Sequence, residues 1–281
     1  MKLNNKRELI ITKGKASLLF VMLVILLSLS FYINDKFYSK TIAITKNNTK
    51  ETIAKPFTNA HMNSRESKVN LKEPFTHSST TNVYNSDGHK IAYLTFDDGP
   101  SPKTTPGILK ILDNYKIKAT FFIVGSRAII RPDLVKMEAE DGQSIGNHTY
   151  SHEYKYIYSN TNTFIKDVNK CDTVLKSIIG GYNSKILRFP GGSFGAKEAP
   201  FRVAIKKAGY HYIDWNDLTG DAEGQNIPVN KLLNNIKKNT KGKEHVVILM
   251  HDAPDKQTTV QALPQVIEYL KSQGYSFNTL K

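Results

Sequence analysis

In the last two thirds of the chain, apolar residues follow two different periods in alternation. Short continuous apolar runs, at residues 91–94, 119–124 and 246–250, are typical of strands buried on both faces of a parallel sheet. Between such runs, apolar residues recur every three or four positions, as in the segments 108–115 and 164–178, and this spacing predicts amphipathic helices. The pattern therefore predicts repeated β-α units.

The number of these units indicates the type of sheet. Four more short strands are predicted at 144–146, 186–189, 211–215 and 275–277, which gives about seven in all. Repeated β-α units imply parallel strands with helices packed outside them. We therefore expect an α/β fold, a distorted and incomplete (β/α) barrel rather than an open sheet. In such barrels the chemistry lies on loops that follow the C-terminal ends of the strands.

The N-terminal third has a different pattern. Residues 16–33 form a run of eighteen residues without a charge, at the short end of what spans a bilayer and longer than most signal-peptide cores. Basic residues precede it, which places the N-terminus in the cytoplasm. No Ala-x-Ala cleavage pattern follows it. We expect an uncleaved single-pass anchor in the cell membrane, with a secreted protein released by signal cleavage as the alternative.

Four segments follow from this pattern: a basic cytoplasmic tail at 1–15, the anchor at 16–33, a flexible linker rich in Asn, Thr, Ser and Lys at 34–88, and a folded domain at 89–281. The formal net charge of +14 suits an anionic surface such as a cell wall or lipid headgroups. The folded domain has no block of basic residues interleaved with aromatics, which argues against a nucleic-acid partner.

The single cysteine, Cys171, excludes an internal disulfide. It lies on the apolar stripe of a predicted helix, so we interpret it as a buried, inert thiol. We expect the protein to be a monomer.

Two adjacent carboxylates, Asp97 and Asp98, follow the first apolar strand at a Gly99-Pro100 turn. Neighbouring anions repel each other, so one of the two carboxylates should have an unusual environment. The alternative is an ordinary acidic turn, because Asp-Gly is a common turn pair. Polar residues that follow other predicted strands favour a functional site.

Two histidines, His148 and His152, are separated by three residues. On one helical turn both imidazoles would face the same way and could share a metal, whereas in a loop they could be a plain surface pair. Two ring nitrogens and one carboxylate oxygen make a three-ligand site for a divalent ion, with positions left open. Zinc is the expected metal, and cobalt or nickel would also suit these ligands. The second carboxylate is then free as a general base.

Four motifs occur in one order within this domain: TFDDGPS from Thr95, HTYSH from His148, RFPGGS from Arg188 and ILMHD from Ile248. The combination resembles the polysaccharide deacetylase family, the NodB-homology domain of carbohydrate esterase family four, over roughly residues 89–281. The resemblance implies a deformed barrel and metal-dependent removal of acetyl groups from N-acetylated sugars.

The resemblance also implies a role for each matching residue. Asp97 corresponds to the general base and His251 to the general acid. Leu249 corresponds to the residue that lines the pocket for the acetyl methyl group. The residues that correspond to the metal ligands are Asp98, His148 and His152.

Two further positions correspond to residues that support the catalytic pair. Arg188 matches the arginine that orients the base, and a guanidinium there would keep Asp97 ionised. Asp221 matches the acid that tunes the catalytic histidine, and a carboxylate near His251 would raise its pKa. A structural ion pair for Arg188 and a capped strand-end histidine for His251 are the alternatives.

Two positions depart from the family's pattern. Gly191 stands where many members have an aromatic residue whose backbone N–H serves the oxyanion hole. Its own N–H can still donate, because the backbone supplies that group. Ala222 stands where many members have a pocket tryptophan, which leaves Asp217 as a competitor of Asp221 for the contact with His251.

We therefore expect an anchored, exported metalloenzyme that removes N-acetyl groups from cell-wall glycan, with peptidoglycan N-acetylglucosamine or N-acetylmuramic acid as the substrate. Chitin-like oligosaccharides or an exopolysaccharide are alternative substrates. A catalytically silent wall-binding protein with the same fold is the alternative from a different class. The enzyme is favoured because five catalytic and metal-binding positions carry the required residues, namely Asp97, Asp98, His148, His152 and His251.

Overall fold

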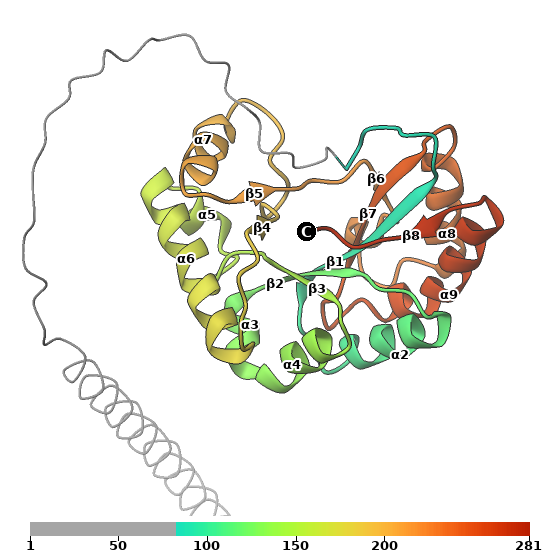
Figure 1. Cartoon of the computed structure of the whole chain (residues 1–281), viewed down its shortest axis with the longest axis horizontal. Helices are drawn as coiled ribbons and strands as arrows, with labels where there is room; N and C mark the ends of the chain where they lie inside the picture. Colours follow the sequence, from blue (N-terminus) through green and yellow to red (C-terminus); the bar gives the residue numbers. More distant parts are fainter. Residues whose placement is uncertain (1–82) are drawn as a thin grey trace, which may run out of the picture. The chain divides into compact units, whose positions relative to one another are not determined.

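The computed structural model describes residues 83–281 (Figure 1). The predicted tail, the predicted anchor and nearly all of the predicted linker lie outside these residues. Within 83–281, no helix has the length and apolar character needed to cross a bilayer. The anchor at 16–33 therefore stays a prediction.

The described chain alternates strands and helices. Its strands are β1 (Ile91–Gly99), β2 (Thr120–Ile123), β3 (Ser144–Asn147), β4 (Ile186–Leu187), β5 (His211–Tyr212), β6 (Asp217–Leu218), β7 (His245–His251) and β8 (Ser276–Phe277). Its helices are α2 (Thr105–Tyr115), α3 (Gly125–Ile130), α4 (Pro132–Glu140), α5 (Tyr154–Ile157), α6 (Thr161–Ile178), α7 (Ala199–Lys207), α8 (Val229–Asn239) and α9 (Gln257–Ser272), with a 3₁₀ turn η1 (Asp221–Glu223).

The strands of residues 83–281 form one parallel sheet in the order β5-β4-β3-β2-β1-β7-β6, and β8 pairs with the start of β1. Within the described part of the chain, no pairing joins β5 to β6, so the barrel is incomplete, as the sequence predicts. Figure 1 shows the helices around the outside of this curved sheet. All seven predicted strands are present, and β6 is an additional one.

The two faces of β1 explain where a site can lie. Leu94 and Phe96 pack toward the helices in the largest core cluster, and the ring of Phe96 stacks on Phe121 at 5.1 Å between centroids. Tyr93 belongs to a second cluster that fills the inside of the half-barrel. Because side chains alternate along a strand, Thr95 and Asp97 share the inner face with Tyr93. The C-terminal end of β1 therefore presents polar groups inside the half-barrel.

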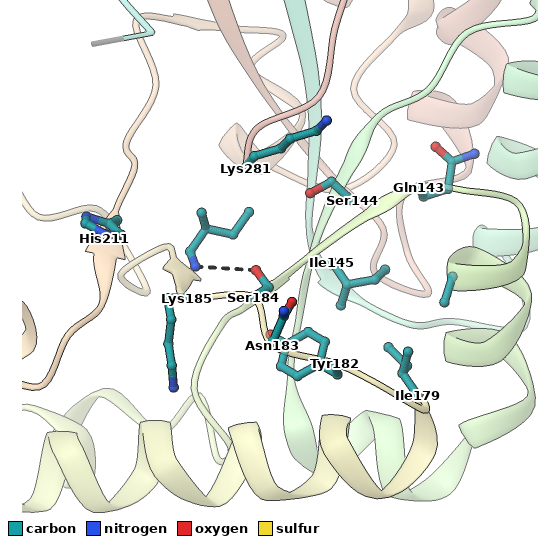
Figure 2. Close-up of a pocket in the computed structure, with 12 residues that line it drawn as sticks. Gln143, Ser144, Ile145, Ile179, Tyr182, Asn183, Ser184, Lys185, His211 and Lys281 are labelled. Carbon is teal, nitrogen blue, oxygen red and sulfur yellow. Dashed lines mark hydrogen bonds between the residues drawn. The ribbon is translucent and has the colours of Figure 1, made fainter. Parts of the chain in front are cut away.

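A pocket of about 540 Å³ lies at the opposite, N-terminal end of the sheet. Its wall includes Ser144 and Ile145 from the start of β3, and Figure 2 shows Tyr182 and Asn183 of the α6–β4 connection beside them. Ser184 turns its hydroxyl to the backbone N–H of Ile186 there. None of the predicted catalytic or metal-binding residues lines this pocket.

Candidate active site and metal centre

Two central, adjacent strands bring the predicted base and acid together. Asp97 of β1 and His251 of β7 are direct partners in the β1–β7 register, at the C-terminal ends of both strands. The backbone N–H of Asp252 donates to the carbonyl of Asp97 at 2.7 Å, which continues the pairing beyond the strand. The spacing of Asp97 and His251 is therefore set by the sheet rather than by a loop.

An irregularity in β1 explains how two successive aspartates serve one site. Asp97 pairs with Phe122 and Gly99 with Ile123, so Asp98 is an extra residue in the ladder, and its φ is 71°. In a regular strand, Asp98 would point toward the helices. The bulge instead turns the side chain of Asp98 toward the inner face, so both carboxylates face the same histidine nitrogen. His148 Nε2 lies 3.8 Å from Asp97 Oδ2 and 3.5 Å from Asp98 Oδ1.

The predicted metal ligands come together in space. Asp98, His148 and His152 each offer a ligand atom, and these atoms lie within 4.8 Å of one another. His152 Nε2 is 3.1 Å from Asp98 Oδ1. The two histidines lie in the loop after β3 and not on a helical turn. Thr149 and His152 have φ values of 64° and 57° there, and this bent backbone brings the two imidazoles to 4.9 Å.

The protonation of this group suits a divalent cation. His148 Nδ1 lies 2.8 Å from the carbonyl oxygen of Arg188, so Nδ1 carries the proton and the Nε2 lone pair faces Asp98. Burial raises the pKa of Asp98, but the neighbouring imidazoles of His148 and His152 outweigh burial and hold that pKa well below its usual range. Two imidazole nitrogens and one ionised carboxylate fit zinc, cobalt or nickel.

Arg188 is a fully buried cation whose guanidinium is held from several sides. Its Nη1 lies 2.9 Å from Asp97 Oδ1 and 2.6 Å from Thr95 Oγ1. Nε and Nη2 donate to the carbonyls of Ile213 and Asp214, each at 3.0 Å. Because removing one member of such a buried pair leaves an uncompensated charge, Asp97 and Arg188 are interdependent.

His251 is paired with a buried carboxylate. Its Nδ1 and its backbone N lie 2.8 Å from the two carboxylate oxygens of Asp221. Burial lowers the pKa of His251, but the hydrogen bond and charge of Asp221 have the larger, opposite effect and raise this pKa to about 9. Asp217 makes no such contact; its Oδ1 accepts from the N–H of Leu218, and burial raises its pKa to about 7. The geometry favours Asp221 as the partner of His251.

The sequence model of the family described as Polysaccharide deacetylase matches residues 84–213. A peptidoglycan-N-acetylglucosamine deacetylase of Bacillus cereus is 35% identical over 195 residues, which cover 69% of this chain and 88% of that protein. The chain belongs to the polysaccharide deacetylase family.

Solved structures of this deacetylase family match the fold as well. The catalytic domain of a peptidoglycan N-acetylglucosamine deacetylase from Eubacterium rectale superposes with a TM-score of 0.64 at 32% identity, covering 72% of this chain and 93% of that one. A family-four carbohydrate esterase from Streptococcus mutans superposes with a TM-score of 0.63 at 33% identity, covering 69% and 87%.

The remaining predicted positions of this deacetylase lie around the same centre. Leu249 is on β7, two residues before His251, and is 9% exposed. Gly191 lies three residues after Arg188, and its backbone N–H donates to no acceptor within residues 83–281. That free N–H is suited to an oxyanion, since a backbone donor needs no side chain. The roles of Leu249 and Gly191 stay predictions.

Sequence reasoning missed three supporting residues. Thr95 accepts from Arg188 and donates to the carbonyl of Ile248 at 2.7 Å. Its position two residues before Asp97, on the same face of the strand, is a signal that could have found it. Thr259 donates to Asp221 Oδ2 at 2.8 Å, and Arg127 donates to the carbonyl of Asp98. Nothing in the local sequence points to these two.

Proposed function

We propose that this chain is a metal-dependent N-deacetylase of cell-wall glycan, exported and anchored by residues 16–33. The observation that carries the proposal is the position of Asp97, whose free Oδ2 faces the cluster of Asp98, His148 and His152. A carboxylate beside such a cluster is the arrangement required for metal-assisted hydrolysis of an amide.

Asp98, His148 and His152 would hold a divalent cation, zinc most readily, which when bound polarises an acetyl carbonyl and makes water more acidic. Asp97 Oδ2 takes a proton from the attacking water. Its other oxygen is bonded to Arg188, so the carboxylate keeps one rotamer and stays negative. The Gly191 N–H donates to the oxygen that becomes negative as water adds to the acetyl carbon.

The second half of the reaction needs an acid. The C–N bond breaks when the sugar nitrogen receives a proton; otherwise water is expelled and the amide re-forms. His251 provides that proton, because Asp221 keeps its imidazole protonated in the neutral pH range. Acetate and a free amino sugar are the products. Asp97, which has gained the water's proton, and His251, which has lost one, then exchange protons with solvent.

The substrate is inferred from the relatives. Three of them carry the name peptidoglycan-N-acetylglucosamine deacetylase, which supports N-acetylglucosamine of peptidoglycan as the reacting sugar. Export past a membrane span would bring the domain to this polymer. Deacetylation of chitin-like oligosaccharides or of an exopolysaccharide uses the same residues and is the second candidate.

The test is deacetylation by the full chain. Glycan strands released from peptidoglycan and N-acetylglucosamine oligomers are incubated with it and examined by mass spectrometry for loss of acetyl groups. We expect loss with zinc present, none after chelation, and recovery on adding zinc back. A chain that binds both glycans but removes no acetyl group at any metal content would instead be a wall-binding protein.

A further inference from the structure

The two glycines after Pro190 have no side chains of their own beside the proposed oxyanion site. Gly191 and Gly192 have φ values of 78° and 88°, where side chains are disfavoured. Two rings occupy the space beside Gly192, since a Cβ there would lie 2.6 Å from Phe194 and 3.0 Å from Trp215. The space beside Gly191 is occupied by one residue from a distant part of the chain.

That residue is Tyr154, the first residue of α5. A Cβ on Gly191 would lie 3.0 Å from a ring carbon of Tyr154 and 3.1 Å from its hydroxyl oxygen. The tyrosine ring therefore occupies the space that an aromatic side chain at position 191 would use. The wall that position 191 lacks is supplied by the loop carrying the metal-ligand candidates.

The ring of Tyr154 is firmly held. It meets the edge of His152 at 5.4 Å and 84°, and it lies 6.0 Å from the ring of Tyr158. Tyr158 is fixed in turn, because its hydroxyl donates to the Pro190 carbonyl at 2.8 Å and its ring stacks on Phe164. Such packing holds Tyr154 in one orientation, which lowers the entropic cost of binding a ligand.

Despite this support, Tyr154 remains 49% exposed. Tyr156 of the same short helix is similarly exposed, at 53%, but stacks on no ring within the described residues. An aromatic ring that is fixed on one side and open on the other, next to a metal-ligand candidate, is a surface for a flat apolar partner. The apolar face of a sugar ring is such a partner.

The hydroxyl of Tyr154 also suits a sugar. A phenol hydroxyl can both donate and accept a hydrogen bond, as sugar hydroxyls do. Since the ring lies to one side of His152, a sugar stacked on it would lie beside the metal cluster rather than over it.

We propose that Tyr154 determines the preference for a polymer, by stacking on the sugar ring next to the one that loses its acetyl group. The proposal rests on the proposed function, because it assigns a neighbouring-sugar contact to the same reaction. It predicts that Tyr154 contributes little with a short substrate and more with a long one.

The experiment measures kcat/KM of the full chain on a dimer and a pentamer of N-acetylglucosamine and on peptidoglycan glycan strands. Tyr154→Ala should lower kcat/KM about tenfold on the two long substrates, mainly through KM, and about twofold on the dimer. Tyr154→Phe keeps the ring and should stay within about threefold of wild type. Tyr156→Ala is the matched control from the same helix and should match wild type on all substrates.

The outcomes separate this inference from the proposed function. Equal losses on dimer and pentamer in Tyr154→Ala, or a loss of bound zinc, would mean that the residue only supports the His152 loop. Wild-type kinetics in Tyr154→Ala would also overturn the inference while leaving the deacetylase intact. A wild-type chain without activity on any of these substrates would overturn the proposed function itself.

Discussion

Carboxyl groups in two regions of this protein have different surroundings. At the C-terminal ends of the strands, Asp97 contacts Arg188, Asp98 contacts two histidines and Asp221 contacts His251. In the outer helix α4, Glu138 is buried on the apolar face, and neither of its oxygens has a hydrogen-bond partner within residues 83–281. Burial and the charge of Asp252 raise the pKa of Glu138 well above its usual value.

The difference shows what a buried carboxyl group needs to stay charged. With a cation or an imidazole beside it, the group remains ionised and can serve as ligand or base. Without one, the group takes up a proton, and its burial lowers the stability of the fold. Removing a partner in the first region should therefore affect catalysis and metal binding, whereas removing Glu138 should affect stability alone.

The largest effect is expected from the imidazoles beside Asp98. His148→Ala and His152→Ala should each abolish stoichiometric zinc binding and deacetylation together, because two remaining ligands do not hold a catalytic ion tightly. Isothermal titration with zinc and an acetate-release assay measure both. Full zinc occupancy in either variant would show that the cluster is not the metal site.

The next effect separates the two adjacent aspartates. Asp97→Asn should keep its zinc and lose about two to four orders of magnitude in kcat, as expected for a general base. Asp98→Asn should lose zinc affinity first. Metal content and kcat measured on the same preparations distinguish the two roles, and the reverse pattern would exchange them.

A loss of similar or smaller size is expected for the acid. His251→Ala should keep zinc, lower kcat by about two orders of magnitude and remove the alkaline limb of the dependence of kcat/KM on pH. The limb reflects loss of the imidazolium proton. An unchanged rate and an intact limb in this variant would assign the proton to another residue.

A smaller change tests the contact between His251 and Asp221. The carboxylate raises the pKa of His251 to about 9, so Asp221→Asn should move the alkaline limb to lower pH, by roughly one to two pH units. A bound cation moves this limb to lower pH in wild type and variant alike, so the quantity to measure is the difference in pH between the two limbs. Asp217→Asn is the control, and a shift there instead would exchange their roles.

The smallest effect, and of opposite sign, is expected in the helix. Glu138→Met should raise the free energy of unfolding by about 1–3 kcal/mol at neutral pH, because it removes a buried carboxyl group without a partner. The folded-state pKa of Glu138 is raised, so wild type loses stability as pH rises above the unfolded value near 4.5. Urea unfolding should therefore show the gain widening from pH 4 to pH 8, with activity unchanged. A variant that is less stable at both pH values would contradict this.

The chemistry could be predicted from the sequence because each motif follows a strong strand. Asp97 and His251 each follow an apolar run, and parallel strands bring such ends to one edge. The sequence left open whether His148 and His152 lie on a helical turn or in a loop, since three intervening residues fit either one; the structure places them in a bent loop.

Other features had no local signal. The strand β6 has two residues, too few for a periodic pattern. The bulge at Asp98 depends on the pairing with β2, and the position of Tyr154 over Gly191 depends on packing between segments far apart in the chain. Such placements follow from tertiary contacts.

The pairing of Asp97 with His251 has a consequence for engineering this enzyme. The two residues proposed to move protons sit on neighbouring central strands, where backbone hydrogen bonds fix their spacing. Two of the three metal-ligand candidates and Tyr154 sit instead on the segment between β3 and α6. Exchange of residues 153–158 between relatives should therefore alter which sugars are accepted while the proton-transfer pair keeps its geometry. Selectivity and proton transfer are thus separable targets for directed evolution.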